Sequence, residues 1–273
     1  MSTKRQRRAE KGLTKARKQK KKFPELLDKV VETSDIILQV LDSRFIEETR
    51  NKEIENLIKK KGKKFLYVLN KSDLVKEKKL EGLKELVPYV LVSTTKRSGG
   101  KELRDKIKYL ARSVVKPFDS ERISVGVIGY PNTGKSSVIN LLIGKKSAKT
   151  SSAAGFTKGF QKLRLSRDIV LMDSPGVIPK KEYSSIDEEK ISQHVMIGAR
   201  DYHKIKEPEI AVSYLIKPRK AMFEKFYKIK FKDSEDLLEK LGRKKNIFKK
   251  KGEVNEDKIA RLIVKDWQEG KIR

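Results

Sequence analysis

The sequence predicts an α/β protein with a doubly wound, mainly parallel six-stranded sheet, followed by a small helical domain at the C-terminal end. Short apolar runs rich in β-branched residues alternate with segments of helical periodicity, the pattern of strands buried between two layers of helices. After about residue 206 the strand-like runs stop, and only short helical patterns follow, at 221–227, 234–242 and 256–267, the last with Asn255 as its expected N-cap. The runs that predict strands are 36–41, 65–69, 88–92, 123–128 and 169–172.

Helices are expected before and between these strands. The first, Phe23–Glu32, has apolar residues at helical spacing on one face. The others are expected near 51–61, 76–86, 100–113 and 137–143. Lys116–Asp119 contains a proline and is expected to link the helix at 100–113 to the strand at 123–128.

The segment Gly129–Ser136, GYPNTGKS, follows the strand at 123–128 directly and precedes a helix that Gly144 ends. This is the strand–loop–helix context of the phosphate loop G-x-x-x-x-G-K-[ST], whose backbone N–H groups surround phosphate oxygens. Lys135 is expected to reach the β- and γ-phosphates, and Ser136 to bind Mg²⁺. The alternative is a plain glycine turn with an exposed lysine. The expected nucleotide contacts in this segment are Asn132, Thr133, Gly134, Lys135, Ser136 and Ser137.

A second motif, Asn70-Lys71-Ser72-Asp73, follows the strand at 65–69. The Asp73 carboxylate can accept two hydrogen bonds from the N1–H and amino group of guanine, which adenine lacks. Asn70 would hold the loop to the base and to the phosphate-loop backbone, and the Lys71 stem would cover the ring. Ser93 and Thr94 follow the third strand and are assigned a supporting backbone contact to guanine.

The order of these two motifs is reversed relative to an ordinary GTPase, in which the phosphate loop comes first. The sequence therefore predicts a circularly permuted P-loop GTPase domain. Alone, Asn-Lys-x-Asp is a weak signal because Asn and Asp are common in turns that follow strands. Together with the phosphate loop it is a strong one.

Two further segments would sense the γ-phosphate. Asp173-Ser-Pro-Gly176 follows the strand at 169–172; Asp173 would hold Mg²⁺ through water, and the Gly176 N–H would bind the γ-phosphate. Thr150–Phe160 is rich in small residues, and we expect a switch loop in which Thr157 closes on Mg²⁺ and the γ-phosphate. Thr150 is the rival residue, and a plain loop threonine is the alternative. The expected catalytic residues are Lys135, Thr157 and Gly176.

The motif order NKSD, Ser-Thr, GYPNTGKS, Thr157, DSPG resembles the circularly permuted YlqF/YawG GTPases, the family of RbgA, over about residues 23–273. Asp42-Ser43-Arg44 corresponds to the Asp-Ala-Arg turn typical of that family. The resemblance implies GTP hydrolysis coupled to maturation of the large ribosomal subunit. An archaeal member fits the lysine-rich, cysteine-free composition best.

The resemblance also bears on the mechanism. Val177 stands where Ras-type enzymes carry a water-orienting glutamine, so a slow intrinsic rate is expected. Asn132 corresponds to a residue that binds K⁺ in several relatives, and K⁺ is therefore a possible second ion. The family's N-terminal histidine is missing; His194 and His203 are interpreted as surface residues of a helix, and what activates water stays open.

Positive charge gathers at both ends of a chain whose net charge is +30. Residues 1–22 carry net +10 and are expected to form a disordered tail that orders on a polyanion, or merely a solubilising arm. Residues 206–273 carry net +8 and are expected to form a basic helical RNA-binding domain, while 23–205 form the GTPase domain. The expected RNA contacts are Arg243, Lys244, Lys245, Lys249, Lys250 and Lys251. Ile247 and Phe248 are interpreted as fixing this loop to the helical core, with base stacking by Phe248 as the alternative.

The remaining composition narrows the class of protein. The chain has no cysteine, and no stretch approaches the roughly 18 apolar residues of a membrane span. We expect a cytoplasmic monomer with GTP or GDP, Mg²⁺ and precursors of the large ribosomal subunit as partners, and no membrane. Two other interpretations remain: a slow GTPase switch for a protein or membrane-surface partner, and an RNA-binding protein that holds guanine nucleotide only as a structural ligand.

Overall fold

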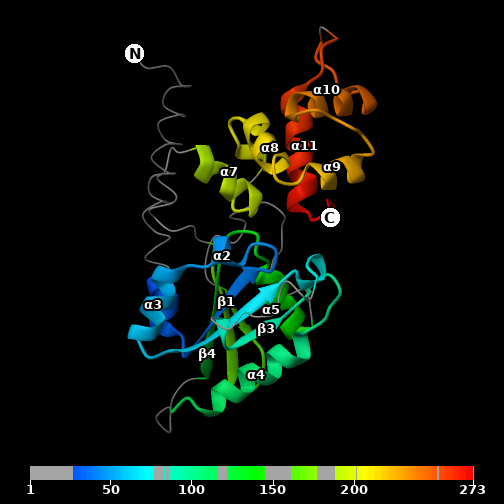
Figure 1. Cartoon of the computed structure of the whole chain (residues 1–273). Helices are drawn as coiled ribbons and strands as arrows, with labels where there is room; N and C mark the ends of the chain where they lie inside the picture. The colour runs from blue at the N-terminus through cyan, green and yellow to red at the C-terminus, as the bar shows by residue number, and fades with distance from the viewer. Residues whose placement is uncertain are drawn as a thin grey trace, which may run out of the picture.

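The computed structural model describes residues 27–76, 83, 86–115, 122–144, 161–176, 188–200, 202–250 and 252–272. They form a sheet with helices on both faces, and a second group of helices that lies beyond the ends of the strands (Figure 1). Four predicted features lie wholly or mostly outside the described residues: the tail 1–22, the helix at 76–86, the linker 116–119 and the switch loop 150–160.

The six strands have the order β3-β2-β1-β4-β6-β5, and all neighbouring pairs are parallel except β5 with β6. This confirms the predicted mainly parallel sheet. The strands are β1 (Ile36–Asp42), β2 (Lys64–Asn70), β3 (Tyr89–Leu91), β4 (Ile123–Ile128), β5 (Gln161–Arg164) and β6 (Ile169–Asp173). The sequence does not indicate β5, because its polar side chains lie at a half-exposed edge of the sheet.

The permuted halves of the chain join in the centre of the sheet. β1, which precedes the base-reading motif, pairs in parallel with β4, which leads into the phosphate loop, with Ile36 opposite Val125. Both strands end at the same edge, and in open α/β sheets ligands bind outside the carboxyl ends of the strands. The pairing of β1 with β4 therefore brings the two motifs to the same end of the sheet, although their order along the chain is reversed.

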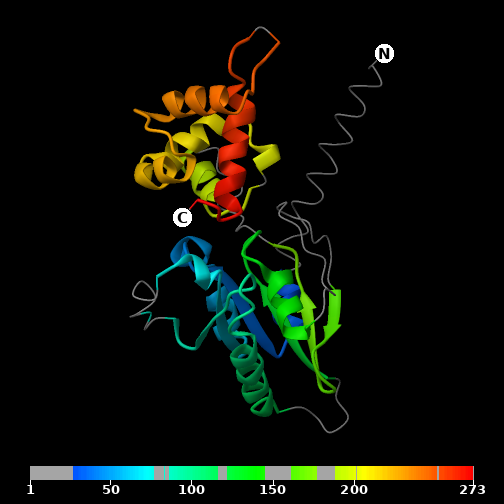
Figure 2. The ribbon, with the colours of Figure 1, turned by 90° about the vertical axis from the view of Figure 1, so that its right-hand side faces the viewer.

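Helices cover both faces of the sheet (Figure 1 and Figure 2). Leu103 of α4 (Gly100–Arg112) and Leu142 of α5 (Lys135–Ile143) belong to one hydrophobic cluster with Leu38 of β1. On the other face, Ile58 of α3 (Lys52–Lys60) and the helical residues 27–33 pack around Ile37. Alternate residues of β1 thus face opposite layers, as a doubly wound sheet requires. α2 (Ile46–Thr49) and the 3₁₀ turn η1 (Ser72–Leu74) follow β1 and β2.

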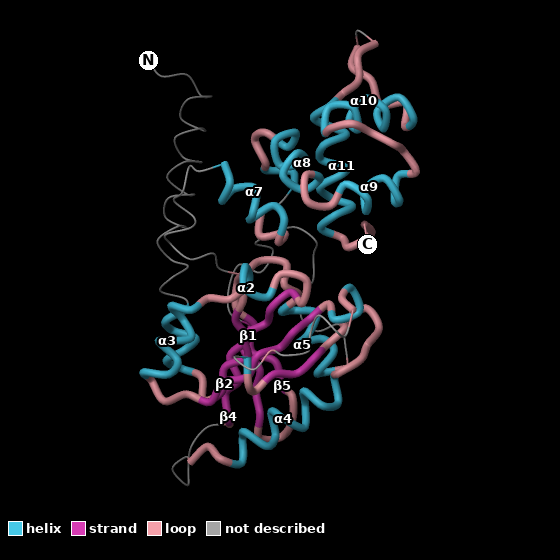
Figure 3. The backbone as a smooth tube through the Cα atoms, viewed as in Figure 1, coloured by secondary structure: helices cyan, strands magenta, loops and turns pink. Residues whose placement is uncertain are grey.

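The described residues of the C-terminal group form helices joined by loops, and no strand (Figure 3). They are α7 (Glu188–Met196), the 3₁₀ turn η4 (Tyr202–Lys204), α8 (Pro208–Ile216), α9 (Lys220–Tyr227), α10 (Ser234–Lys244) and α11 (Glu256–Gln268). The last three agree with the predicted helices, and Asn255 caps α11 by accepting a hydrogen bond from the Lys258 N–H at 3.1 Å. No helix among the described residues has the length and apolar character to cross a membrane.

The helical core extends beyond the segment assigned to it from the sequence. Its buried residues include Val195, which precedes the predicted boundary, and also Phe45 and Tyr130, which belong to the sheet domain by sequence. The predicted boundary at residue 206 stays a prediction, since shared packing does not test whether either part folds alone.

Candidate nucleotide-binding site

The loops that follow β2 and β4 meet at the carboxyl edge of the sheet. The Asn70 side-chain amide donates to the carbonyl of Thr133 at 2.8 Å, which is the predicted tie between the base-reading motif and the phosphate loop. Gly134 has φ +95°, and a Cβ there would run into the Asn70 amide. A glycine is therefore needed at this position for both its dihedral and its lack of a side chain.

Lys135 begins α5 and folds back over its own loop. Its ammonium donates to the carbonyls of Gly129 at 3.1 Å and Tyr130 at 2.8 Å. Burial lowers the pKa of Lys135 to about 8, an effect that the neighbouring Asp173 carboxylate partly opposes. The lysine is thus held where phosphate oxygens would replace backbone carbonyls as its partners.

Ser136 and Asp173 lie together, as a Mg²⁺ site requires. The Ser136 hydroxyl donates to Asp173 Oδ2 at 2.8 Å. Asp173 Oδ1 is buried and has no hydrogen-bond partner among the described residues, and burial raises the pKa of this carboxyl group. A buried carboxylate oxygen next to a hydroxyl fits hydrated Mg²⁺, which takes oxygen ligands and keeps several waters.

Gly176 places the DSPG segment directly against the phosphate loop. A Cβ on Gly176 would lie 2.6 Å from Pro131 Cα and 2.9 Å from Lys135 Nζ. Only a residue without a side chain allows the two backbones to approach this closely. Ser174 adds a hydrogen bond from its hydroxyl to the carbonyl of Val127 in β4.

On the base side, Ser93 has a part that the sequence analysis missed. Its hydroxyl donates to Asp73 Oδ1 at 2.6 Å and accepts from the Lys96 N–H at 3.0 Å. Ser93 therefore orients the carboxylate that would read guanine, whereas only a backbone contact was expected. The strand pairing of β2 with β3 is what brings the two loops together, and it is not visible in the motif itself. Ser72 lies in η1, and Thr94 is half-buried beside Ser93.

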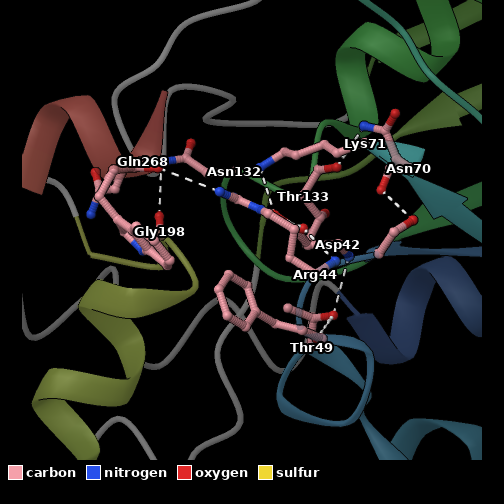
Figure 4. Close-up of polar contacts among 12 residues, drawn as sticks. Asp42, Arg44, Thr49, Asn70, Lys71, Asn132, Thr133, Gly198 and Gln268 are labelled. Carbon is pink, nitrogen blue, oxygen red and sulfur yellow. Dashed lines mark hydrogen bonds and ion pairs between the residues drawn. The ribbon is translucent and has the colours of Figure 1, made fainter. Parts of the chain in front are cut away.

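The helical domain touches the phosphate loop. The Asn132 side-chain amide donates to the carbonyl of Gly198 at 2.8 Å (Figure 4). Tyr130 of the phosphate loop is almost fully buried in the helical core. The sequence of the loop does not predict this contact, because Tyr130 and Asn132 are also compatible with an exposed turn.

Several predicted residues are placed differently or lie outside the description. Thr157 and Val177 lie outside the described residues. His194 is buried, so its interpretation as a surface residue is wrong, because α7 packs into the helical core; His203 is exposed as expected.

The basic segment before α11 is only partly a loop. Arg243 and Lys244 belong to the last turn of α10. The guanidinium of Arg243 pairs with Glu239 at 2.6 Å, and the ammonium of Lys244 donates to the carbonyl of Tyr227 at 2.8 Å. Both thus have structural contacts that the sequence did not indicate. Lys245, Lys249 and Lys250 are exposed, and Lys251 lies outside the described residues.

Ile247 packs against the helical core, whereas Phe248 is 42% exposed. The predicted role of fixing the loop to the core is therefore confirmed for Ile247. For Phe248 it is wrong, because this residue is exposed and is not among the apolar residues that pack against the core.

Comparison with known proteins agrees with this geometry. Residues 124–247 match the family model described as 50S ribosome-binding GTPase. The chain is 39% identical to an uncharacterized GTP-binding protein of Methanocaldococcus jannaschii, over 92% of this chain and 67% of that protein. It is 35% identical to nucleolar GTP-binding protein 2 of Saccharomyces cerevisiae, over 93% of this chain and 53% of that protein. The chain thus spans about half the length of its nucleolar relatives.

The fold is that of solved GTPase structures. The GNP-bound YlqF of Thermotoga maritima superposes with a TM-score of 0.58 at 22% identity, covering 94% of each chain. The GDP-bound form gives a TM-score of 0.59 at 20% identity, covering 89% of this chain and 93% of that one. GTPases of this kind use Mg²⁺. With the reversed motif order joined by the β1–β4 pairing and a relative matched along two thirds of its length, the chain belongs to the circularly permuted YlqF/YawG family of GTPases.

Proposed function

We propose that this GTPase acts in assembly of the large ribosomal subunit and binds its rRNA and precursor particles in a nucleotide-dependent way. The observation that carries the proposal is the contact of the helical domain with the phosphate loop, through buried Tyr130 and the Asn132–Gly198 hydrogen bond. A change at the phosphates can therefore reach the helices directly. The match to a family described as 50S ribosome-binding GTPase and the similarity to nucleolar GTP-binding protein 2 support the same assignment.

The rRNA would bind the basic end of the helical domain. Exposed lysines are suited to phosphate contacts, and the exposed ring of Phe248 is suited to stacking on an unpaired base. The proposed contacts are Arg243, Lys244, Lys245, Lys249, Lys250 and Lys251. We propose that GTP favours the RNA-binding arrangement and that hydrolysis releases it.

In the proposed mechanism, Asp73 reads guanine, Asn70 and Lys71 hold the base, and Ser72, Ser93 and Thr94 support that loop. Lys135 and the first turn of α5 bind the phosphates, while Thr157 and Gly176 sense the γ-phosphate. Ser136, Thr157 and, through water, Asp173 would hold Mg²⁺, which neutralises charge on the β- and γ-phosphates when bound. Asn132 is the candidate K⁺ ligand.

The proposed intrinsic turnover is slow, because Val177 cannot orient water. We expect it to be on the order of 10⁻³ per second or below, since activating groups missing from a GTPase site are worth about 10³ to 10⁵ in rate. Ribosomal particles would supply the acceleration. The protein would act as a monomer in the cytoplasm.

Co-sedimentation with separated ribosomal subunits tests the proposal. The large subunit should pellet the full chain more strongly with a non-hydrolysable GTP analogue than with GDP, and the small subunit serves as the control. Equal affinities in the two nucleotide states would defeat the switch. Acceleration of turnover by a protein activator but not by particles would favour a signalling switch, and no turnover with Mg²⁺, K⁺ and particles would favour a structural role for the nucleotide.

A further inference from the structure

Asp42, the last residue of β1, is a buried carboxylate that receives four hydrogen bonds. Its Oδ2 accepts from the Lys71 ammonium at 2.8 Å and from Arg44 Nη2 at 2.8 Å. Its Oδ1 accepts from the backbone N–H and the Nε of Arg44, both at 3.0 Å. One buried carboxylate thus fixes two cations, one of which belongs to the base-reading motif (Figure 4).

The positive charges of Lys71 and Arg44 stabilise the ionised form of Asp42. Burial alone would raise the pKa of Asp42, but the ammonium of Lys71 and the guanidinium of Arg44 hold it well below the usual range. Asp42 is therefore ionised at neutral pH, and its charge partly opposes the effect of burial, which lowers the pKa of Lys71. Lys71 itself has a left-handed backbone, φ 61°, and its ammonium is tethered at the far end, so its stem is held from both sides.

Arg44 connects the Asp42–Lys71 pair to the helical domain. Its Nη1 donates to the carbonyl of Trp267 near the end of α11 at 3.4 Å, and its guanidinium lies 5.8 Å from the centre of the Trp267 ring. A second contact runs beside it: a Cβ on Gly270 would lie 2.9 Å from Leu74 Cδ1 in η1. The end of α11 therefore rests on the loop that would read the base.

We propose that Asp42 and Arg44 are positioning residues: Asp42 holds Lys71 in place for the guanine ring, and Arg44 ties this loop to the end of α11, so that base binding and helical-domain placement are coupled. The proposal rests on the proposed roles of Asp73 and Lys71 in reading guanine. It adds a second route to the helices, from the base rather than from the phosphates.

Trp267 is the only tryptophan of the chain, so its fluorescence reports on this contact in the unmodified protein. In the full chain, GDP should change Trp267 emission. Arg44→Gln should abolish that change while weakening GDP by less than about threefold, because Asp42 still holds Lys71. Arg50→Gln is the matched control: Arg50 is equally buried and pairs with Glu47 and Glu55 inside the sheet domain.

Asp42→Asn and Lys71→Met test the positioning of the lysine. Each should weaken GDP about tenfold, the size expected for losing a charge-assisted hydrogen bond at a site. The double variant should be no weaker than either single one, since both remove the same contact. A protein merely destabilised by Asp42→Asn would show additive losses, and Lys71→Met remains informative if the Asp42 variant does not fold.

Two results would overturn the proposal. One is a Trp267 response to GDP that is the same in Arg44→Gln as in the parent chain, including no response in either. The other is parental GDP affinity in Lys71→Met. The variant Asp73→Asn distinguishes failure of this proposal from failure of the base-reading assignment on which it rests. It should weaken GTP and favour xanthine nucleotide. A retained preference for guanine would instead reject the base-reading site.

Discussion

At the scale of single residues, the nucleotide site holds two buried charges whose pKa values both move toward the neutral form. Burial lowers the pKa of Lys135 to about 8 and raises that of Asp173. Each group has the other as its charged partner, but this attraction does not offset the effect of burial; an additional anion for the lysine and an additional cation for the carboxylate would stabilise both charges. A Mg²⁺–nucleotide complex supplies both.

The Lys135 pKa predicts that nucleotide binding takes up protons above pH 8. There the free protein carries a partly neutral Lys135, whereas the phosphates favour its charged form, so affinity falls as pH rises. Calorimetric titration with Mg²⁺–GDP at pH 8.5, in buffers of different ionisation enthalpy, measures the uptake. At pH 6.5 Lys135 is charged in both states and should contribute none. Equal proton uptake at the two pH values would contradict the assignment.

Gly176→Ala should weaken a non-hydrolysable GTP analogue more than GDP. The added methyl would collide with the backbone of Pro131 and displace the segment that would contact the γ-phosphate. Such a collision costs on the order of 1–3 kcal/mol, or about 5- to 150-fold in affinity for the analogue. Affinities for the two nucleotides in the parent and variant check this. Equal weakening of both would mean that the methyl disturbs the phosphate loop alone.

At the scale of elements, the sequence predicts most of the fold because local patterns match the tertiary environment. The strands with continuous apolar runs and the amphipathic helices α3, α4, α10 and α11 were located within a few residues. β5 was missed because an edge strand needs no apolar run. α8 was not located because PEIAVSYLI is apolar nearly all round, which leaves no helical period to detect.

The candidate site likewise contains residues that local motifs reveal and contacts that only the fold reveals. Phosphate-loop and NKSD residues keep fixed spacings within one segment, so they can be found without knowing the fold. The contacts of Ser93 with Asp73 and of Asp42 with Lys71 join different strands, and only the strand order brings those side chains together. Burial of Tyr130 depends on where a separate group of helices packs.

The N-cap of α11 gives a prediction at this scale. Asn255→Ala should lower the free energy of unfolding by about 1 kcal/mol, because the Lys258 N–H would lose its acceptor. Asn255→Ser keeps a capping oxygen and is the matched control. Urea denaturation of the three proteins measures the difference. Equal losses in both variants would show that the cap contributes nothing and that another Asn255 contact matters.

At the scale of the whole molecule, permutation changes which part of the chain follows the DSPG segment. β6 and the DSPG segment no longer lead back into the sheet; the chain continues to α7 and the helical core. That core also touches the phosphate loop at Tyr130 and the base-reading side through Trp267 and Gly270. The permuted chain thus has one group of helices in contact with both the phosphate loop and the loop that follows β2.

The net charge of +30 makes any RNA binding strongly dependent on salt, and the location of the contacts can be separated from total charge. Replacing Lys245, Lys249 and Lys250 by alanine should weaken binding to large-subunit rRNA and reduce the slope of log affinity against log salt by about 2 to 3, one counterion per phosphate contact. The matched control replaces Lys59, Lys60 and Lys101, exposed lysines of α3 and α4, by alanine, so that net charge changes equally. Filter binding across a salt series measures both slopes. Equal reductions in the two triple variants would mean that rRNA responds to overall charge and not to the basic end of the helical domain.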